Sequence, residues 1–316
     1  MHRVVLPPSA LRVAAACPPS RRHPEPGAPT ACPAGPRDTV ATQHICCHDD
    51  AVTEQAVEQW RTVDEGWGRR AADFATLIEP AAVREYLDVH LRLEIGPGTR
   101  LLDMACGAGL ALELARLRGA EVSGVDASPR LVEVARLRNP GARIVVGDMA
   151  ADHFGPETFD AVTSFRGIWA TTPAAVAQVA RVLRPGGRAA LTFWGEMAES
   201  EGGRLLAPFR LATPEQVDRQ SDMVALKRPG AAAAFVAEAG LVPGEPFPVP
   251  FVMEFADVEH YVRGLAATGP GYEALRTAGE ERFAEVCREM AAPFVRDGLP
   301  IRAALQLIGI VGTAPG

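Results

Sequence analysis

The sequence predicts a doubly wound α/β protein, in which helices cover both faces of a parallel sheet. The first observation is a short apolar run, Leu101–Met104, that leads into a small-residue loop with two glycines. A helical pattern follows this loop at once, with Leu110, Leu114 and Leu117 on one face. The second observation is that strand-like and helix-like patterns go on alternating to about residue 195, joined by short turns. Such alternation is typical of parallel sheets.

The loop after the first predicted strand is a candidate ligand site. It runs from Asp103 to Gly109 and reads D-M-A-C-G-A-G. Its glycines let backbone N–H groups come close to a ligand, because a Cβ there would collide with it. A dinucleotide fingerprint would carry a third glycine where Leu112 stands, and a large residue opposes close helix–strand packing at that place. Asp103 also suits a cationic ligand better than a pyrophosphate.

This loop resembles motif I of the class I S-adenosylmethionine (SAM) methyltransferases, whose usual form is close to D-x-x-C-G-x-G. The resemblance extends to F-D-x-V at Phe159–Val162 and to L-x-P-G-G at Leu183–Gly187, and at motif level it covers residues 95–195. It implies a Rossmann-like sheet of seven strands with the last one antiparallel, helical lid and cap insertions, and SAM as the cofactor. The overall pattern is similar to the UbiE-like small-molecule branch.

Candidate cofactor contacts lie where the first four predicted strands end. Asp126 ends the second strand (120–126), where a carboxylate can accept hydrogen bonds from both hydroxyls of a ribose; an ordinary strand-end acid is the alternative. In the resembled family, an acid and the next backbone N–H after the third strand contact adenine, and Asp148 and Met149 match these positions. The predicted cofactor set is Asp103, Ala105, Gly107, Gly109, Asp126, Ala127, Asp148, Met149 and Phe165.

Three residues are candidates for the substrate side. Trp67 belongs to a predicted helical segment (51–93) that, in similar methyltransferases, covers the cofactor; core packing is the alternative. Trp169 could form a flat wall or a cation–π contact to the sulfonium, or pack in the core. Arg166 could bind an acidic group of the acceptor, or form a surface ion pair.

The chain divides into four predicted segments. Residues 1–48 are rich in proline and lack periodicity, which predicts a disordered tail or a start placed too early; their composition also has a weak likeness to a transit peptide. Residues 49–95 are predicted as an N-terminal helical lid and 96–196 as the SAM-binding core. Residues 197–316 are predicted as substrate-cap insertions with the last strands of the sheet, at 247–255 and 305–312.

Charge, hydropathy and cysteine content limit the partners, the compartment and the metal sites that the sequence predicts. The net charge is −7, and residues 1–48 carry five arginines but two acids, so the remainder carries −10. An acidic folded part argues against nucleic acid as a partner. No apolar run reaches membrane-spanning length, which predicts no membrane partner. The six cysteines form no disulfide framework, so a cytoplasmic protein is expected. We predict no metal, since the cysteine–histidine cluster His44–His48 lies in the predicted disordered tail.

The sequence predicts SAM-dependent methyl transfer to a small-molecule acceptor by in-line displacement. No general base stands out, because His90, His153 and His260 are expected at the surface or in packing. Cys106 is expected to be a small residue that fits the loop rather than a nucleophile. Two alternatives stay open, as do the acceptor, its reacting atom and the oligomeric state. One is an NAD(P)-dependent oxidoreductase, and the other is a catalytically silent SAM-binding protein.

Overall fold

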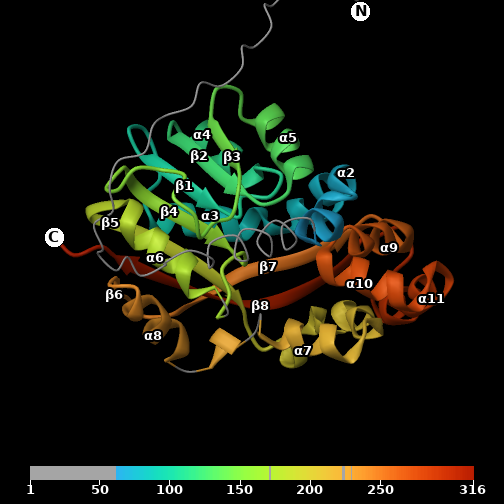
Figure 1. Ribbon diagram of the computed structural model, residues 1–316. Helices are drawn as coiled ribbons and strands as arrows, with labels where there is room; N and C mark the ends of the chain where they lie inside the picture. Colours follow the sequence, from blue (N-terminus) through green and yellow to red (C-terminus); the bar gives the residue numbers. More distant parts are fainter. Residues whose placement is uncertain (1–61, 171, 223–224, 229) are drawn as a thin grey trace, which may run out of the picture. The chain divides into compact units, whose positions relative to one another are not determined.

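The strands form where the apolar runs of the sequence predict them. The computed structural model describes residues 62–170, 172–222, 225–228 and 230–316. Five successive strands pair in parallel, and a sixth strand position continues the sheet in the antiparallel direction (Figure 1). The strands are β1 (Arg100–Met104), β2 (Glu121–Asp126), β3 (Arg143–Val146), β4 (Phe159–Phe165), β5 (Leu183–Trp194), β6 (Val242–Pro243), β7 (Phe247–Phe255) and β8 (Ile301–Thr313).

The strand order is β3-β2-β1-β4-β5-β8-β6, with β7 also paired to β8. This order confirms the doubly wound fold and the antiparallel late strand. Within the described residues, the sheet has eight strands and not the expected seven, because two strands, β7 and β6, pair one after the other along the same edge of β8. β7 pairs with β8 from Ile301 to Gly309, and the two-residue β6 pairs with Gly312 and Thr313. The two short partners therefore occupy a single strand position.

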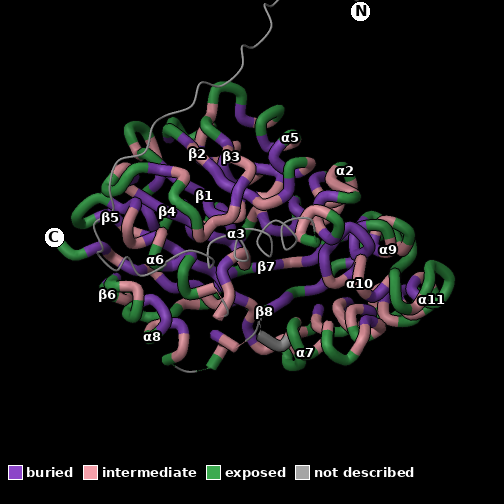
Figure 2. Tube along the Cα trace, in the orientation of Figure 1, coloured by how far each residue is buried: buried purple, intermediate pink, exposed green. Residues whose placement is uncertain are grey.

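Helices cover the sheet on both faces, because successive residues of a strand point to opposite sides. Leu101 packs in one apolar cluster with α3, α4 and α5, whereas Leu102 packs in a second cluster with α6 and α8. Figure 2 shows the strands largely in the buried colour. The helices are α2 (Ala71–Asp73), α3 (Val83–Arg92), α4 (Leu110–Leu117), α5 (Pro129–Arg138), α6 (Pro173–Val182), α7 (Pro214–Asp222), α8 (Ala231–Glu238), α9 (Val258–Ala266), α10 (Gly269–Ala278) and α11 (Glu280–Ala291).

The inward face of α4 differs from the predicted one. The buried residues are Ala111, Leu112 and Ala115, whereas Leu117 is 70% exposed. Close approach to the sheet selects the small residues, and Leu112 fits because β2 carries a glycine opposite it. A Cβ on Gly124 would lie 2.9 Å from Leu112 Cδ1. The glycine that permits tight packing thus stands on the strand rather than on the helix.

Two groups of helices lie beside the carboxyl ends of the parallel strands and contact one another. The N-terminal group contains the π-helical turns η1 (Asp64–Gly68) and η2 (Phe74–Ile78), followed by the 3-10 turn η3 (Glu79–Ala82). The late group contains α9–α11 and the 3-10 helix η5 (Glu201–Leu211). η1 packs on α10 and η2 packs on α9, and Figure 1 shows α2 near these late helices.

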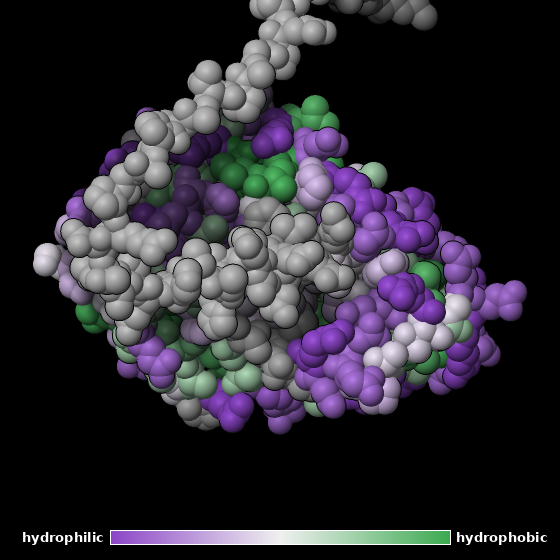
Figure 3. Space-filling model, in the orientation of Figure 1, coloured by the Kyte–Doolittle hydropathy of each residue, from purple (hydrophilic) through white to green (hydrophobic). Residues whose placement is uncertain are grey.

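The late group presents a hydrophilic outer surface. On the face drawn in Figure 3, purple predominates over the region of α9 to α11. Their apolar residues, such as Tyr261, Leu265 and Phe283, are buried instead. In the part of the chain that the structure describes, no helix has the length and apolar character needed to cross a membrane. The predicted tail (1–48) and the start of the predicted lid lie outside the described residues.

Candidate functional site

A cavity of about 980 Å³ lies at the carboxyl ends of β1, β2 and β4, between the sheet and the two helix groups. Parallel strands bring their carboxyl ends to one edge, which is where α/β sheets bind ligands, and the volume is in the range of small-molecule sites. The cavity brings together all but one of the predicted site residues. Those that line it are Trp67, Asp103, Ala105, Gly107, Asp126, Ala127, Asp148, Met149, Phe165, Arg166 and Trp169.

The glycine loop is fixed by Asp126 at the end of β2. One carboxylate oxygen accepts a hydrogen bond from the Gly107 N–H at 2.8 Å, and the other accepts from the Ser128 N–H at 2.8 Å. Each oxygen keeps a second lone pair for a ligand hydroxyl. Ala105 and Gly107 both have positive φ, +59° and +55°. Left-handed backbone in a non-glycine residue such as Ala105 is costly and is concentrated at functional sites.

Gly109 is the predicted cofactor residue that does not line the cavity. Its φ is +78°, and a Cβ there would lie 2.8 Å from Ala135 Cβ and 2.9 Å from Asn139 Nδ2. Its N–H donates to the Cys106 carbonyl within the loop. The structure therefore assigns Gly109 to the close approach of α5, and no cavity contact supports the predicted cofactor role.

Carboxylates gather at the glycine-loop end of the cavity. Burial raises the pKa of Asp103 well above its usual range. The hydrogen bond that the Thr163 hydroxyl donates to Asp103, at 2.7 Å, lowers this pKa, whereas the nearby carboxylates of Glu79, Asp126 and Glu85 raise it further. Burial also raises the pKa of Asp126, against the hydrogen bonds from Ser128 and Gly107. A bound cation would relieve this unbalanced charge, whereas a pyrophosphate would add to it.

Glu79 joins the N-terminal group to the glycine loop. Its carboxylate accepts from the Leu110 N–H at the start of α4, at 3.3 Å, and forms an ion pair with Arg138 of α5. The side chain is 2% exposed, and burial raises its pKa to about 7 although Arg138 opposes the shift. This contact was not predicted, because an acid in a helical segment gives no sign in sequence that it will be buried.

Glu79 should make stability depend on pH. Its pKa rises from the ordinary 4.5 to about 7 on folding, so between these values the folded state binds more protons than the unfolded state. The free energy of unfolding should therefore fall as the pH rises from about 4.5 to about 7, and Glu79→Gln should flatten this part of the profile. Urea unfolding across this range measures it, with Glu65→Gln, an exposed acid, as the control. Parallel profiles for wild type and Glu79→Gln would contradict the assignment.

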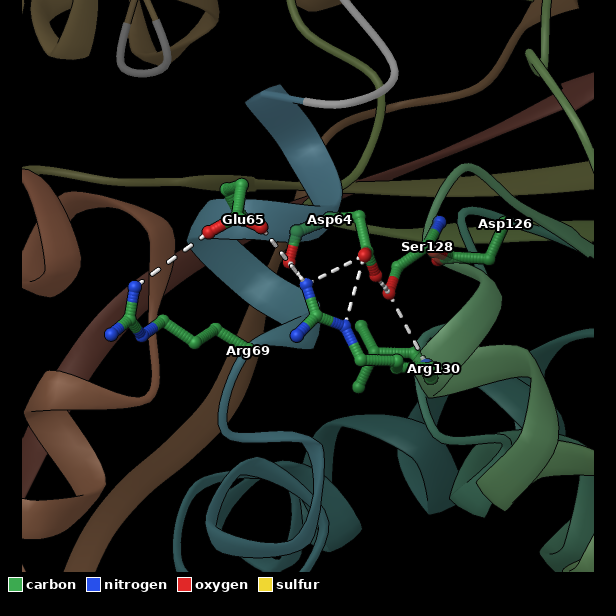
Figure 4. Close-up of polar contacts among 7 residues, drawn as sticks. Asp64, Glu65, Arg69, Asp126, Ser128 and Arg130 are labelled. Carbon is green, nitrogen blue, oxygen red and sulfur yellow. Dashed lines mark hydrogen bonds and ion pairs between the residues drawn. The ribbon is translucent and has the colours of Figure 1, made fainter.

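A second acid of the N-terminal group, Asp64, contacts the start of α5 close to Asp126 (Figure 4). Asp64 in η1 accepts from the Ser128 hydroxyl at 2.6 Å and from Arg130 Nε at 2.9 Å. Burial alone would raise the pKa of Asp64, but the hydrogen bonds from Arg130 and Ser128 and the charge of Arg130 hold it below its ordinary value. Because Trp67 of the same turn lines the cavity, these contacts hold one wall of the site in place.

Asp64→Ala should loosen η1 without unfolding the sheet. It removes an ion pair and a hydrogen bond, together worth about 1–2 kcal/mol in a partly exposed setting. We expect faster hydrogen exchange in a peptide spanning η1 and SAM affinity lowered about three- to tenfold. The matched control is Glu65→Ala, whose contacts to Arg69 and Arg130 are longer, at 3.7 and 3.5 Å, and exposed. Equal exchange in the two variants would show that Asp64 does not hold this wall.

Arg166 forms a buried ion pair on the other side of the cavity. Its Nε and Nη2 groups contact Glu85 at 3.0 Å, and the Arg166 side chain is 17% exposed while that of Glu85 is fully buried. The guanidinium also lies over the rings of Trp194 and Phe251. The predicted alternative, a surface ion pair, is therefore wrong, because the ion pair that Arg166 forms is buried. Arg166 lines the cavity, so the prediction of an acceptor contact stays open.

The remaining candidates follow from the same geometry. Trp169 is half-buried, lines the cavity and donates from Nε1 to the Arg166 carbonyl at 2.8 Å. None of His90, His153 and His260 lines the cavity. Burial raises the pKa of Cys106 well above its usual range, which fits an unreactive small residue. Sequence reasoning missed the apolar wall made by the late segments, which comprises Met197, Leu206, Phe209, Phe251, Met253, Phe255 and Leu265.

Comparison with known proteins agrees with this site. Residues 101–187 match the family model described as a methyltransferase domain. Over these residues the chain is similar to the class I SAM-dependent methyltransferases. Among relatives, the uncharacterized methyltransferase sll0829 of Synechocystis sp. is 39% identical over 103 residues, which are 31% of this chain and 49% of that protein. The ubiquinone biosynthesis O-methyltransferase of Xanthomonas oryzae is 38% identical over 109 residues, 32% of this chain and 44% of that protein.

The chain thus spans about half the length of these two relatives. A chain of the solved complex between the Haloferax volcanii Trm112 methyltransferase activator and a methyltransferase superposes with a TM-score of 0.52, at 18% identity over 80% of this chain and 97% of that one. This likeness shows the fold alone. SAM is the cofactor of this methyltransferase domain, and the chemistry of the cavity fits it. SAM carries a sulfonium and an ammonium group, which the carboxylates at the glycine loop can balance, and ribose hydroxyls, which Asp126 can accept.

Proposed function

We propose that the protein transfers a methyl group from SAM to a small-molecule acceptor. The observation that carries this proposal is one continuous cavity with two unlike ends. The end at the glycine loop holds the buried carboxylates Asp103 and Asp126, and the other end is lined by aromatic and apolar side chains. A cationic cofactor fits the first end and an apolar acceptor fits the second.

Positioning would supply much of the catalysis. Bound SAM supplies an activated methyl group, and in-line displacement requires the acceptor atom to lie opposite the sulfur. The loop after β4, with Arg166 and Trp169, lies between the two ends of the cavity and is suited to orient the acceptor. The contacts of Glu79 and Asp64 keep the N-terminal group against the site, which limits the access of water.

The chemistry of the cavity also bears on the two alternatives, an NAD(P)-dependent oxidoreductase and a catalytically silent SAM-binding protein. An NAD(P)-dependent oxidoreductase would need to place a pyrophosphate beside Asp103 and Asp126, which like charge opposes. A catalytically silent SAM-binding protein is supported by one observation, that no histidine of the described residues lines the cavity. Acceptors whose nucleophile is already ionised at neutral pH do not need such a base. We also propose a cytoplasmic location, as the cysteine pattern of the sequence predicts.

The test combines calorimetric titration with SAM and NADPH and a methyl-transfer screen with labelled SAM. We expect SAM to bind, NADPH not to bind, and at least one low-molecular-weight acceptor to become labelled. NADPH binding without SAM binding would overturn the proposal. SAM binding with no turnover over a broad panel of phenols, amines, thiols and acids would favour the silent binding protein.

A further inference from the structure

The charged side chains along the cavity are segregated by sign. Among the described residues, four acids line it: Glu79 in the N-terminal group, and Asp103, Asp126 and Asp148 at the carboxyl ends of β1, β2 and β3. The cations that line it lie elsewhere: Arg166 follows β4, and Arg204 and Arg210 belong to η5. The cofactor end therefore favours positive charge, and the wall formed by η5 favours negative charge.

The two arginines of η5 share one row of this helix. A 3-10 helix has three residues per turn, so side chains three apart lie above one another. Arg204, Ala207 and Arg210 form one row, with the arginines about 12 Å apart along the axis, and Gly203, Leu206 and Phe209 form the neighbouring row. Both rows line the cavity, and Ala207 between the arginines is half-buried. Arg204 and Arg210 are themselves exposed, so the arginine row lies at the border between the cavity and solvent.

Neither arginine has a protein partner among the described residues. Arg166, the third cation of the cavity, is neutralised by the buried Glu85. Arg204 and Arg210, by contrast, form no ion pair, hydrogen bond or ring contact within the part of the chain that the structure describes. Two uncompensated guanidinium groups at the border of an apolar chamber are donors that match a carboxylate or a similar anion.

The chamber next to this row selects an apolar body. Trp194, Phe251 and Phe255 come from β5 and β7, and Leu206 and Phe209 come from the row of η5 beside the arginines. Aromatic walls of this kind favour flat or ring-bearing groups. A molecule with its apolar part here would place one end toward the loop after β4 and its other end at the border that carries Arg204 and Arg210.

We infer that the acceptor is an amphipathic organic acid, with an apolar ring system in the chamber and an anionic group bound by Arg204 and Arg210. This inference rests on the proposed function, which it deepens by naming the class of acceptor. The anion binds on η5 and not at the glycine loop that carries the carboxylates, so the two ligands do not compete for charge. The methylated atom is then at the end of the molecule remote from the anion.

The test uses two fluorescent probes that differ only in one sulfonate group, with the full-length protein. They are 8-anilinonaphthalene-1-sulfonate and the neutral N-phenyl-1-naphthylamine, which share one aromatic body. We expect wild type to bind the sulfonate more tightly. The double variant Arg204→Gln, Arg210→Gln should weaken sulfonate binding about tenfold or more and change the neutral probe less than about twofold. The matched control is Arg296→Gln, an exposed arginine away from the cavity, which should change neither affinity.

A salt series on wild type gives a second reading that needs no variant. Sulfonate binding should weaken as ionic strength rises, and binding of the neutral probe should not. Equal affinities of wild type for the two probes, or sulfonate binding unchanged in the double variant, would overturn the inference. A SAM titration of the same samples separates this outcome from the proposed function. Absent SAM binding with an intact probe difference would overturn the methyltransferase proposal and leave the anion site.

Discussion

Gly107→Val is expected to reduce SAM affinity by about a hundredfold or more, an effect of roughly 3 kcal/mol. Gly107 has φ +55°, a backbone conformation that a β-branched residue adopts only under strain. A Cβ there would lie 3.4 Å from Phe74 Cε1 and 3.6 Å from Glu79 Oε1, so the Cβ itself fits but its two methyl groups would enter the space between the N-terminal group and the loop. Relief of this strain would move the Gly107 N–H away from Asp126.

Gly98→Val separates the local effect from backbone strain. Gly98 also has a left-handed φ, +82°, but a Cβ there would meet nothing within 4 Å, and the residue does not line the cavity. Both variants should lose about 1–3 kcal/mol of stability from strain. Only Gly107→Val should lose SAM binding, which calorimetric titration beside thermal melting would show. Normal SAM affinity in folded Gly107→Val would remove the basis for placing the cofactor at this loop.

The strands could be predicted closely because each is an apolar run that ends in turn residues. The sequence pattern places β7 with the observed bounds, Phe247–Phe255, and places β2 to within one residue, at 120–126 against the observed 121–126. Buried strands are short and continuous in hydrophobicity, so tertiary contacts change their limits little. The carboxyl ends of β1, β2 and β3 lie at one edge of the sheet, which is why the predicted cofactor residues Asp103, Asp126 and Asp148 line one cavity.

The helix faces were less predictable, since hydrophobicity alone does not show how closely a helix approaches the sheet. In α5, the large apolar residues Leu131, Val134 and Leu137 recur at helical spacing, but the buried residues are Leu131, Val132 and Ala135, and Leu137 is 83% exposed. The short distance between α5 and the glycine loop favours Ala135, which lies against Gly109. A leucine at that contact would not fit.

The acceptor end of the cavity could not be derived from sequence, because its walls come from distant segments. α10 begins with Gly269-Pro270-Gly271, a pattern typical of a turn, and it forms because the Thr268 hydroxyl caps the Gly271 N–H at 3.1 Å. Its neighbour η5 is a 3-10 helix of eleven residues, far longer than is usual. No local sequence pattern predicts α10 or η5. Arg204 and Arg210 therefore could not be predicted as site residues from the sequence alone.

Asp126→Ala is expected to lower SAM affinity by about 1–3 kcal/mol and stability by a similar amount. On sequence grounds a strand-end acid could be removed without cost to the fold. The structure changes that expectation, because the carboxylate accepts hydrogen bonds from the buried N–H groups of Gly107 and Ser128, each at 2.8 Å. Alanine leaves both donors without their acceptor, and in the complex it would also leave the ribose hydroxyls without one.

Asp126→Asn separates these two losses. The asparagine carbonyl can accept one of the two backbone N–H groups, but its amide must then face the other donor, so part of the stability should return while SAM affinity stays low. A distant control is Asp160→Ala, which removes an acid bonded to Arg100 and Arg184 at the opposite end of β4 and should leave SAM affinity unchanged. Calorimetric titration and urea unfolding of the three variants measure both quantities. Wild-type SAM affinity in Asp126→Ala would mean that the ribose binds elsewhere, and unchanged stability would mean that water replaces the carboxylate at the loop.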